Sequence, residues 1–107
     1  MEKTPEETSA GLFNNMHMVR IVAWMSDKPF GETFTATDIH QDLGLVHSLV
    51  SPVLHRLVQI DLVARHPRDM RDGYSVIPYS RTEHALWEPF GVLCKLIIED
   101  KADSPPG

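Results

Sequence analysis

The sequence predicts a single small domain that is mainly α-helical and carries one β-hairpin. Apolar residues recur at helical spacing in four stretches of the chain. Between the third and fourth stretches, two short runs of strand-forming residues flank a loop rich in turn formers. The length of 107 residues leaves room for one hydrophobic core. Together these observations predict a mainly α fold with a small β-hairpin.

Both ends of the sequence are polar. Residues 1–10 are acidic and residues 102–107 are rich in proline, so we expect two disordered tails around a folded unit of residues 11–101. The acidic N-terminus is unlike a signal peptide, and no apolar run reaches the roughly 18 residues that a membrane span needs. With Cys94 as the single cysteine, an internal disulfide and a zinc-thiolate cage are excluded. We therefore expect a cytoplasmic protein.

The first predicted helix covers residues 11–27. Its apolar residues form one stripe in the first half, whereas the second half, around Ile21 to Met25, is apolar on almost every side. A helix of this kind must be buried on more than one side, and in a chain this small the second side is expected to face another subunit. Residues 26–31, which include Pro29 and Gly31, end the helix.

A second helix is predicted to begin at Thr35 and to end before Gly44. Phe34 and Thr35 are expected to form a very short strand ahead of it. Asp38 stands three residues after Thr35, which is a capping-box arrangement, and a glycine such as Gly44 is common just past a helix end. Its buried positions are expected at Ala36, Ile39 and Leu43.

The third predicted helix, residues 48–60, has one apolar and one polar side. Val50, Leu54 and Leu57 share the apolar side. Its start has two interpretations: Ser48 caps the helix and Pro52 closes the first turn, or Ser51 caps it and Pro52 is the first helical residue. The opposite side carries small and polar residues, namely Ser48, Pro52, His55 and Gln59, flanked by Ser51 and Arg56.

A hairpin and a last helix complete the chain. Residues 62–66 and 74–77 are strand-like, and the loop of residues 67–73 places Arg68 and Arg71 at the tip of the hairpin. Ser80 and Glu83 form a capping-box pattern that predicts the start of the last helix, which runs to about Asp100. Pro89 inside this helix is expected to kink or split it.

The charges are unevenly distributed. The whole chain carries a formal charge of −5, but residues 43–82 carry five arginines against three aspartates. A locally basic surface on an acidic body is compatible with specific DNA binding, although such a charge pattern also arises by chance.

The order of these elements, two helices, a short turn, a helix, a hairpin and a helix, resembles a winged helix-turn-helix. Residues 46–65 resemble the recognition-helix segment of HxlR- and MarR-type bacterial regulators, and Leu86 to Pro89 followed by Leu93 resembles the start of their last helix. Two features depart from the pattern: Asp61 replaces a glycine, and residues 76–82 are longer than the usual junction. The matching positions in the first segment are Ser48, Val50, Ser51, Leu54, Leu57, Leu62, Val63 and Arg65.

This resemblance implies binding to double-stranded DNA. The third predicted helix would enter the major groove, where base edges can be distinguished, and the hairpin would contact phosphates or the minor groove. The expected base-contacting residues are Ser48, Ser51, Pro52, His55 and Arg56, and the expected hairpin contacts are Arg68 and Arg71.

Two functional hypotheses follow. The first is a sequence-specific transcriptional regulator, a repressor, that acts as a homodimer on a palindromic site. The second is a winged-helix module for protein interaction or architectural DNA binding in plasmid or phage DNA maintenance. The first and last helices carry more apolar surface than one small core can absorb, so we expect the dimer contacts to include Leu12, Trp24, Trp87, Phe90, Leu93 and Ile97.

Other chemistry finds no support in the sequence. Glycine-rich phosphate loops, nucleophile elbows and paired carboxylates in apolar surroundings are absent, so we do not expect an enzyme. The six histidines form no H-x-x-x-H pair on a predicted helix face, and we expect neither a metal nor a cofactor. Cys94 lies on an apolar helix face, where a reactive thiolate is disfavoured.

Overall fold

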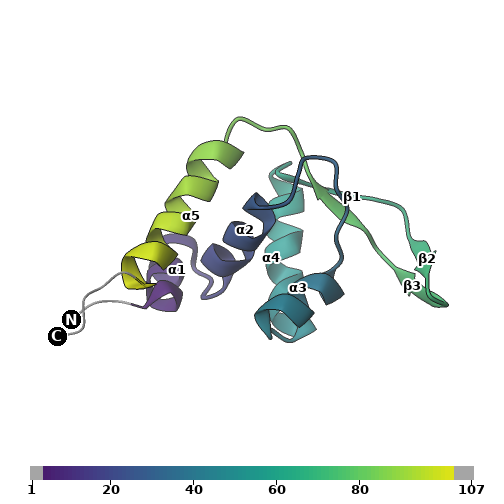
Figure 1. Cartoon of the computed structure of the whole chain (residues 1–107), viewed down its shortest axis with the longest axis horizontal. Coiled ribbons are helices and arrows are strands. Elements are labelled where there is room, and N and C mark those ends of the chain that lie inside the picture. Colours follow the sequence, from purple (N-terminus) through teal and green to yellow (C-terminus); the bar gives the residue numbers. More distant parts are fainter. Residues whose placement is uncertain (1–3, 103–107) are drawn as a thin grey trace.

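The computed structural model describes residues 4–102 and shows a bundle of helices with a long hairpin at one end (Figure 1). Helices α1 and α5 lie at the end that carries the termini, α2 lies between α5 and α4, and the hairpin extends from the opposite end. The described elements are α1 (Pro5–Phe13), α2 (Met18–Ser26), α3 (Ala36–Leu43), α4 (His47–Gln59), β1 (Val63–Arg65), β2 (Asp69–Arg71), β3 (Tyr74–Val76), β4 (Tyr79–Arg81) and α5 (Trp87–Ala102).

The N-terminal helix begins earlier than the sequence predicts. Thr4 caps α1 through a capping box in which its side chain accepts from the Glu7 amide and the Glu7 side chain accepts from the Thr4 amide. Pro5 follows at the first helical position, where its missing N–H costs nothing. The expected disordered tail of residues 1–10 is therefore wrong from Pro5 onward. Residues 1–3 and 103–107 of the expected tails lie outside the described residues.

The single helix expected over residues 11–27 is divided in two. Asn14 takes a left-handed conformation with φ 54° and ends α1, and its backbone N–H donates to the Ala10 carbonyl. Asparagine is one of the few residues that adopt this conformation readily. Asn15 then accepts a hydrogen bond from the His17 amide just before α2. The apolar period continues through this break, so periodicity alone does not reveal it.

Helix α2 is the centre of the core. Its apolar side chains are buried on several sides, as the sequence predicts, but the neighbours are α1, α3, α4 and α5 of the same chain. Helix α5 can approach closely because a side chain at Gly91 would meet Ser26 Oγ at 2.6 Å. The fully buried large side chains include Ile21, Met25, Phe34, Ile39, Leu54, Leu57, Leu62 and Trp87.

Helices α3 and α4 form the predicted helix-turn-helix. The Thr35–Asp38 capping box begins α3, and Gly44, with φ 70°, ends it. Helix α4 begins at His47 after Val46, and no side-chain hydrogen bond caps it, so neither predicted capping serine is the N-cap. Pro52 lies inside the helix, on its exposed side.

The hairpin is longer than predicted and consists of two antiparallel ladders. At its base, β1 pairs with β4 and places Arg65 opposite Tyr79. Further out, β2 pairs with β3, and the chain reverses at Asp72 and Gly73, which both have positive φ. Residues 69–71, expected in the loop, are therefore strand residues. The expected short strand at Phe34 is confirmed as a bridge to Tyr79.

The beginning of α5 corrects two predictions. Ser80 does not cap a helix: it pairs with Ala64 in the ladder, and its hydroxyl is hydrogen-bonded to His66 Nε2 at 2.8 Å. The residues that make the junction longer than in the HxlR and MarR pattern thus form β4. Helix α5 begins at Trp87, so Pro89 lies in the first turn, where no intrahelical N–H is required, and the helix continues unbroken.

Asp61 occupies the position of the usual glycine with φ 65°, as the sequence predicts for a residue that tolerates a left-handed backbone. Within residues 4–102, no helix combines the length and the apolar character required to cross a membrane.

Candidate nucleic-acid interface

The exposed side of α4 and the base of the hairpin enclose an open groove. Four of the residues predicted to contact bases line it: Ser48, Ser51, Pro52 and His55. Across the groove lie Arg65 of β1 and Tyr79 of β4. The structure therefore brings the predicted polar face of α4 next to the hairpin, although these elements are separated in sequence.

A second hollow continues this groove toward α3. It shares Ser51 and Tyr79 with the first, so the two form one surface, which we call the α4–wing surface. The start of α3 contributes small side chains and the hairpin contributes Arg68 and Ser75. The full lining of the second hollow is Thr35, Ala36, Thr37, His47, Ser51, Arg68, Ser75, Val76, Ile77 and Tyr79.

Arg56 departs from the group predicted on α4. Its Nη1 donates to the Phe13 carbonyl at 2.8 Å, which directs the side chain toward the end of α1. Arg56 does not line the groove. The structure thus separates it from Ser48, Ser51 and His55, because a tertiary contact decides where this long side chain points.

The two hairpin arginines are exposed and make weak contacts to hydroxyl groups. Arg68 Nη1 donates to Ser75 Oγ at 3.2 Å across the β2–β3 ladder. Arg71 Nη2 donates to Thr33 Oγ1 at 3.1 Å in the loop before α3. Because the acceptors are uncharged hydroxyl groups in exposed positions, these hydrogen bonds contribute little net free energy, and both guanidinium groups are available for a stronger anionic acceptor.

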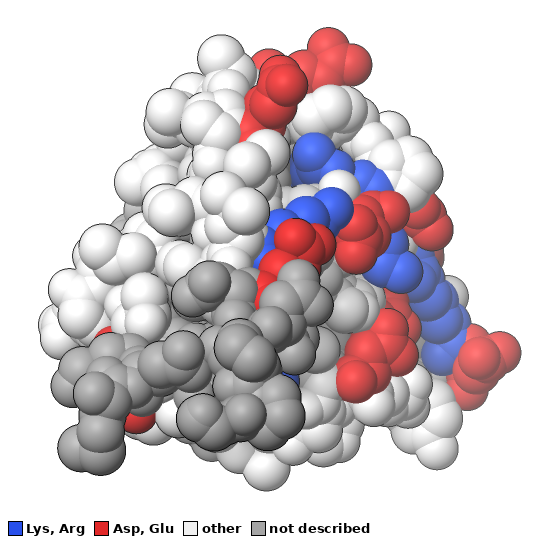
Figure 2. Space-filling model, turned by 60° about the vertical axis from the view of Figure 1, so that its left-hand side comes forward, with Lys and Arg blue, Asp and Glu red and all other residues white. Residues whose placement is uncertain are grey.

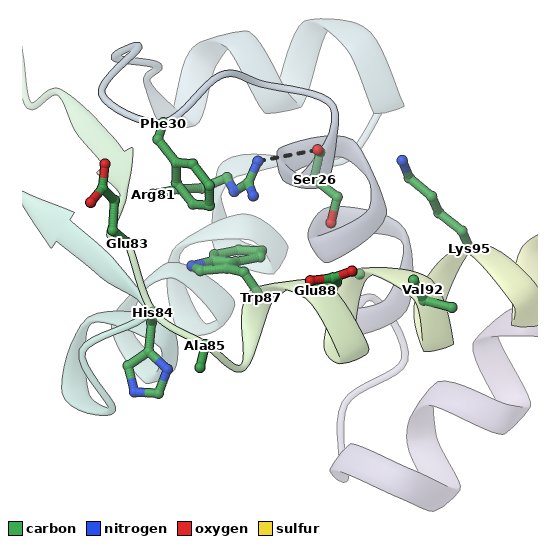
Figure 3. A pocket seen from close by; sticks show the side chains of 11 residues that line it. Ser26, Phe30, Arg81, Glu83, His84, Ala85, Trp87, Glu88, Val92 and Lys95 are labelled. Carbon is green, nitrogen blue, oxygen red and sulfur yellow. Dashed lines mark hydrogen bonds between the residues drawn. The ribbon is translucent and has the colours of Figure 1, made fainter.

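Arg81 differs from the other hairpin arginines because its guanidinium packs against other elements of the same chain. Its guanidinium lies between the rings of Phe30 and Trp87, 4.2 and 4.6 Å from the ring centroids (Figure 3). Its Nη1 donates to the Ser26 carbonyl at 3.1 Å and to the Lys28 carbonyl at 2.6 Å, where α2 ends. Burial lowers the pKa of this guanidinium below its ordinary value. Arg81 therefore fastens β4 to α2 and α5 and cannot count as a phosphate contact.

Arg65 and Tyr79 are among the lining residues that sequence reasoning missed. Arg65 is the last matching position of the recognition-helix segment, so the motif contained a signal for it. Tyr79 follows Pro78, where the hairpin was expected to end, and only the second ladder reveals that it faces α4.

An uncharged, apolar surface lies at the opposite end of the molecule. Leu12, Leu93 and Leu96 are 57%, 42% and 56% exposed, and Phe90 and Ile97 are half-buried beside them on α5. The rings of Phe13 and Phe90, 5.4 Å apart, join α1 to α5. Figure 2 brings this end forward: charged side chains gather mainly in a band on the right, and the upper left part shows uncharged side chains.

Two of the residues predicted at a dimer contact lie elsewhere. Trp87 is only 2% exposed, and its Nε1 donates to the Leu62 carbonyl at 2.8 Å. It belongs to the core of its own chain, which overturns its predicted place in a dimer contact. Trp24 lies on the charged side of α5, in a hollow with Lys95, and its Nε1 donates to Asp42.

Metal and redox chemistry gain no support from the described residues. Residues 4–102 contain no cluster of three or more His, Cys, Asp or Glu side chains that could hold a metal ion. Cys94 is fully buried, and burial raises the pKa of its thiol to about 12. A neutral, inaccessible thiol is a poor nucleophile.

Comparison with known proteins identifies the fold. The sequence matches no protein-family model and no curated protein. A solved structure that matches is the adhesin competence repressor (AdcR) from Streptococcus pyogenes, with a TM-score of 0.62 and 20% identity. The match covers 90% of this chain and 66% of the repressor chain, so the present chain spans somewhat less than two thirds of that protein.

AdcR is a winged-helix regulator of the MarR family, and the described helices and hairpin have the same architecture. The predicted fold class, mainly α with a β-hairpin wing in a winged helix-turn-helix, is confirmed. In this fold α4 stands at the position of the recognition helix and the β1–β4 hairpin stands at the position of the wing.

Proposed function

We propose that this protein is a sequence-specific regulator of transcription, a repressor, that binds double-stranded DNA as a homodimer. The observation that carries the proposal is the α4–wing surface. Here the exposed side of α4 presents mainly short or polar side chains, Ser48, Ser51, Pro52 and His55, beside an arginine-bearing wing. We place this activity in the cytoplasm.

The shape of this surface suits the major groove. An α-helix fits this groove when its outward side chains are short enough for close approach. Serine hydroxyls and a histidine ring can donate to and accept from base edges, while Arg65 and Arg68 lie where a phosphate backbone would pass. The molecule carries a net charge of −5, so indiscriminate attraction to DNA is weak and local contacts must supply the affinity.

The apolar surface of α1 and α5 supports the homodimer. Leu12, Leu93 and Leu96 leave large apolar side chains in water at the end of the molecule opposite the wing. A two-fold symmetric contact through this surface would bury these three leucines of both subunits. It would leave the α4–wing surface of each subunit free. Phe90 and Ile97, half-buried in the single chain, would lie at the edge of such a contact.

Selection of binding duplexes from a random-sequence pool tests the proposal. We expect the full chain to recover one palindromic sequence with two half-sites, because a two-fold symmetric dimer reads a symmetric site. Titration with salt should then show a selected duplex bound far more tightly than an unselected duplex of equal length.

A runner-up function, the interaction or architectural module, is distinguished by the same experiment. Recovery of no preferred sequence, with equal binding of selected and unselected duplexes, would replace the regulator by an architectural DNA-binding module. Absence of binding to every duplex at low salt would leave only protein interaction. The observation that favours this alternative is the net charge of −5, because attraction of an acidic protein to DNA is weak.

A further inference from the structure

Pro52 occupies an unfavourable position inside α4. Proline has no N–H, so it cannot donate a hydrogen bond to the Ser48 carbonyl one turn earlier, and an interior proline lowers the stability of a helix. Helix α4 nevertheless continues unbroken from His47 to Gln59, and the proline ring is exposed. Local rules of this kind are broken most often where a residue is needed for function. The stability of the chain therefore does not explain this proline.

The ring of Pro52 is an apolar contact among polar groups. Ser48 precedes it by four residues and His55 follows it by three, so helical spacing makes both its neighbours on the exposed face. Within residues 4–102, the side chains of Ser48, Ser51 and His55 make no hydrogen bond. The groove thus presents free donors and acceptors around ring carbons that can make only apolar contacts.

We propose that Pro52 reads the 5-methyl group of a thymine in each half-site of the DNA. This inference rests on the proposed DNA-binding function. In the major groove the base edges display hydrogen-bond donors and acceptors, and the thymine methyl is the main apolar group among them. The proline ring gains nothing from the polar edges, whereas contact with a methyl group removes apolar surface of both partners from water.

The polar neighbours of Pro52 indicate where this thymine lies. Residues three or four apart on a helix are separated by about 5–6 Å, and successive base pairs by about 3.4 Å. Ser48, Pro52 and His55 would therefore meet neighbouring base pairs. We expect the thymine inside the half-site, between the base pairs that the serine and the histidine contact.

Replacement of thymine by uracil isolates the methyl contact, because uracil keeps the hydrogen-bonding edge and lacks only the methyl group. Each thymine of the duplex recovered from the random-sequence selection is replaced in turn, at the same position of both half-sites. At one position we expect binding to weaken by about fourfold for each half-site, the effect of returning one methyl group to water. The slope of log affinity against log salt should not change, since no phosphate contact is lost. A C·G pair at that position should bind weakly, and 5-methylcytosine should recover part of the affinity.

The matching protein variant is Pro52→Ser, measured as the full chain by fluorescence anisotropy with labelled duplexes. It keeps a short side chain, removes the apolar ring and supplies the missing N–H, so thermal unfolding should move to a higher temperature. It should bind the thymine and uracil duplexes equally, and Pro52→Ala, which retains an apolar Cβ, should keep part of the difference. Pro29→Ser is the matched control, because Pro29 is exposed between α2 and α3 and lies outside the α4–wing surface.

The methyl contact is supported if uracil weakens binding of the parent chain and of Pro29→Ser at one position, and Pro52→Ser abolishes that difference. It is overturned if the parent chain binds the selected duplex and no uracil replacement changes the affinity, or if the selected half-site lacks thymine. A uracil effect of undiminished size in Pro52→Ser also overturns it and assigns the effect to another side chain or to DNA shape. These outcomes leave the proposed function intact, whereas failure of the parent chain to bind any duplex overturns the proposed function and the methyl contact together.

Discussion

Replacement of Arg71 by alanine should weaken DNA binding in a way that differs measurably from replacement of His55. Arg71 is on the wing with an exposed guanidinium, whereas His55 is on α4 and lines the groove. Arg71→Ala should therefore reduce affinity for all sequences together. His55→Ala should reduce the affinity for the selected duplex more than for an unselected one, by about 1–3 kcal/mol for each base that His55 reads.

The expected size of the Arg71 effect follows from the arginines that the structure leaves available. Arg81 is used inside the chain and Arg56 is directed to the end of α1, which leaves Arg65, Arg68 and Arg71 on or beside the α4–wing surface. Three phosphate contacts in each subunit of a dimer give a slope of log affinity against log salt of about −5. Arg71→Ala removes one contact from each subunit, so the slope should become shallower by about 2.

Fluorescence anisotropy with one selected and one unselected duplex over a salt series measures both effects. Arg20→Ala is the matched control, since it removes the same charge from α2 at a distance from the groove, where Arg20 pairs with Glu6. An unchanged slope for Arg71→Ala would show that the wing makes no phosphate contact. If Arg71→Ala and His55→Ala both bind like the parent chain, the proposed DNA-binding function is wrong although the fold is right.

Three further predictions concern assembly and stability. Leu93→Asp should place two carboxylates in the proposed dimer contact and shift sedimentation toward monomer at micromolar concentration, whereas a parent chain that is already monomeric there would refute the dimer. Asp61→Ala should lower the free energy of unfolding by about 1 kcal/mol, because alanine tolerates φ 65° poorly, and Asp61→Gly should not; equal melting temperatures for the two variants would contradict this. Burial raises the pKa of the Cys94 thiol from an ordinary 9.0 to about 12, so the contribution of this thiol to stability should be constant below pH 9 and fall as the pH rises toward 12, by up to about 1.4 kcal/mol per pH unit. Denaturant titrations should show this component disappear in Cys94→Val, and the same pH dependence in that variant would assign it to another group.

The parts of the fold that depend on neighbouring residues were predictable. The Thr35–Asp38 capping box and Gly44 define α3 within a few residues of sequence, and the structure places both ends there. The left-handed turn at Asp61 is equally local. The same holds for the polar side of α4, because helical spacing alone places Ser48, Pro52 and His55 on one face.

The parts that depend on distant residues were not predictable. Ser80 and Glu83 have the local pattern of a helix start, but pairing with Ala64 and the hydrogen bond to His66 draw Ser80 into a strand. Trp87 was expected at a dimer contact and is buried because its indole N–H reaches the Leu62 carbonyl. The direction of Arg56 likewise follows from the Phe13 carbonyl, which lies 43 residues earlier in the chain.

The position of Arg81 has a consequence for the spacing of a DNA site. Its contacts fasten the last wing strand to the end of α2 and to Trp87, the first residue of α5. In a dimer formed through α5, the separation of the two recognition helices would then be set by rigid elements, without a flexible hinge between wing and interface. The two half-sites would have to lie on the same face of the duplex, about one helical turn apart from centre to centre. An operator lengthened by half a helical turn would present one half-site on the wrong face, and the protein could not twist to reach it.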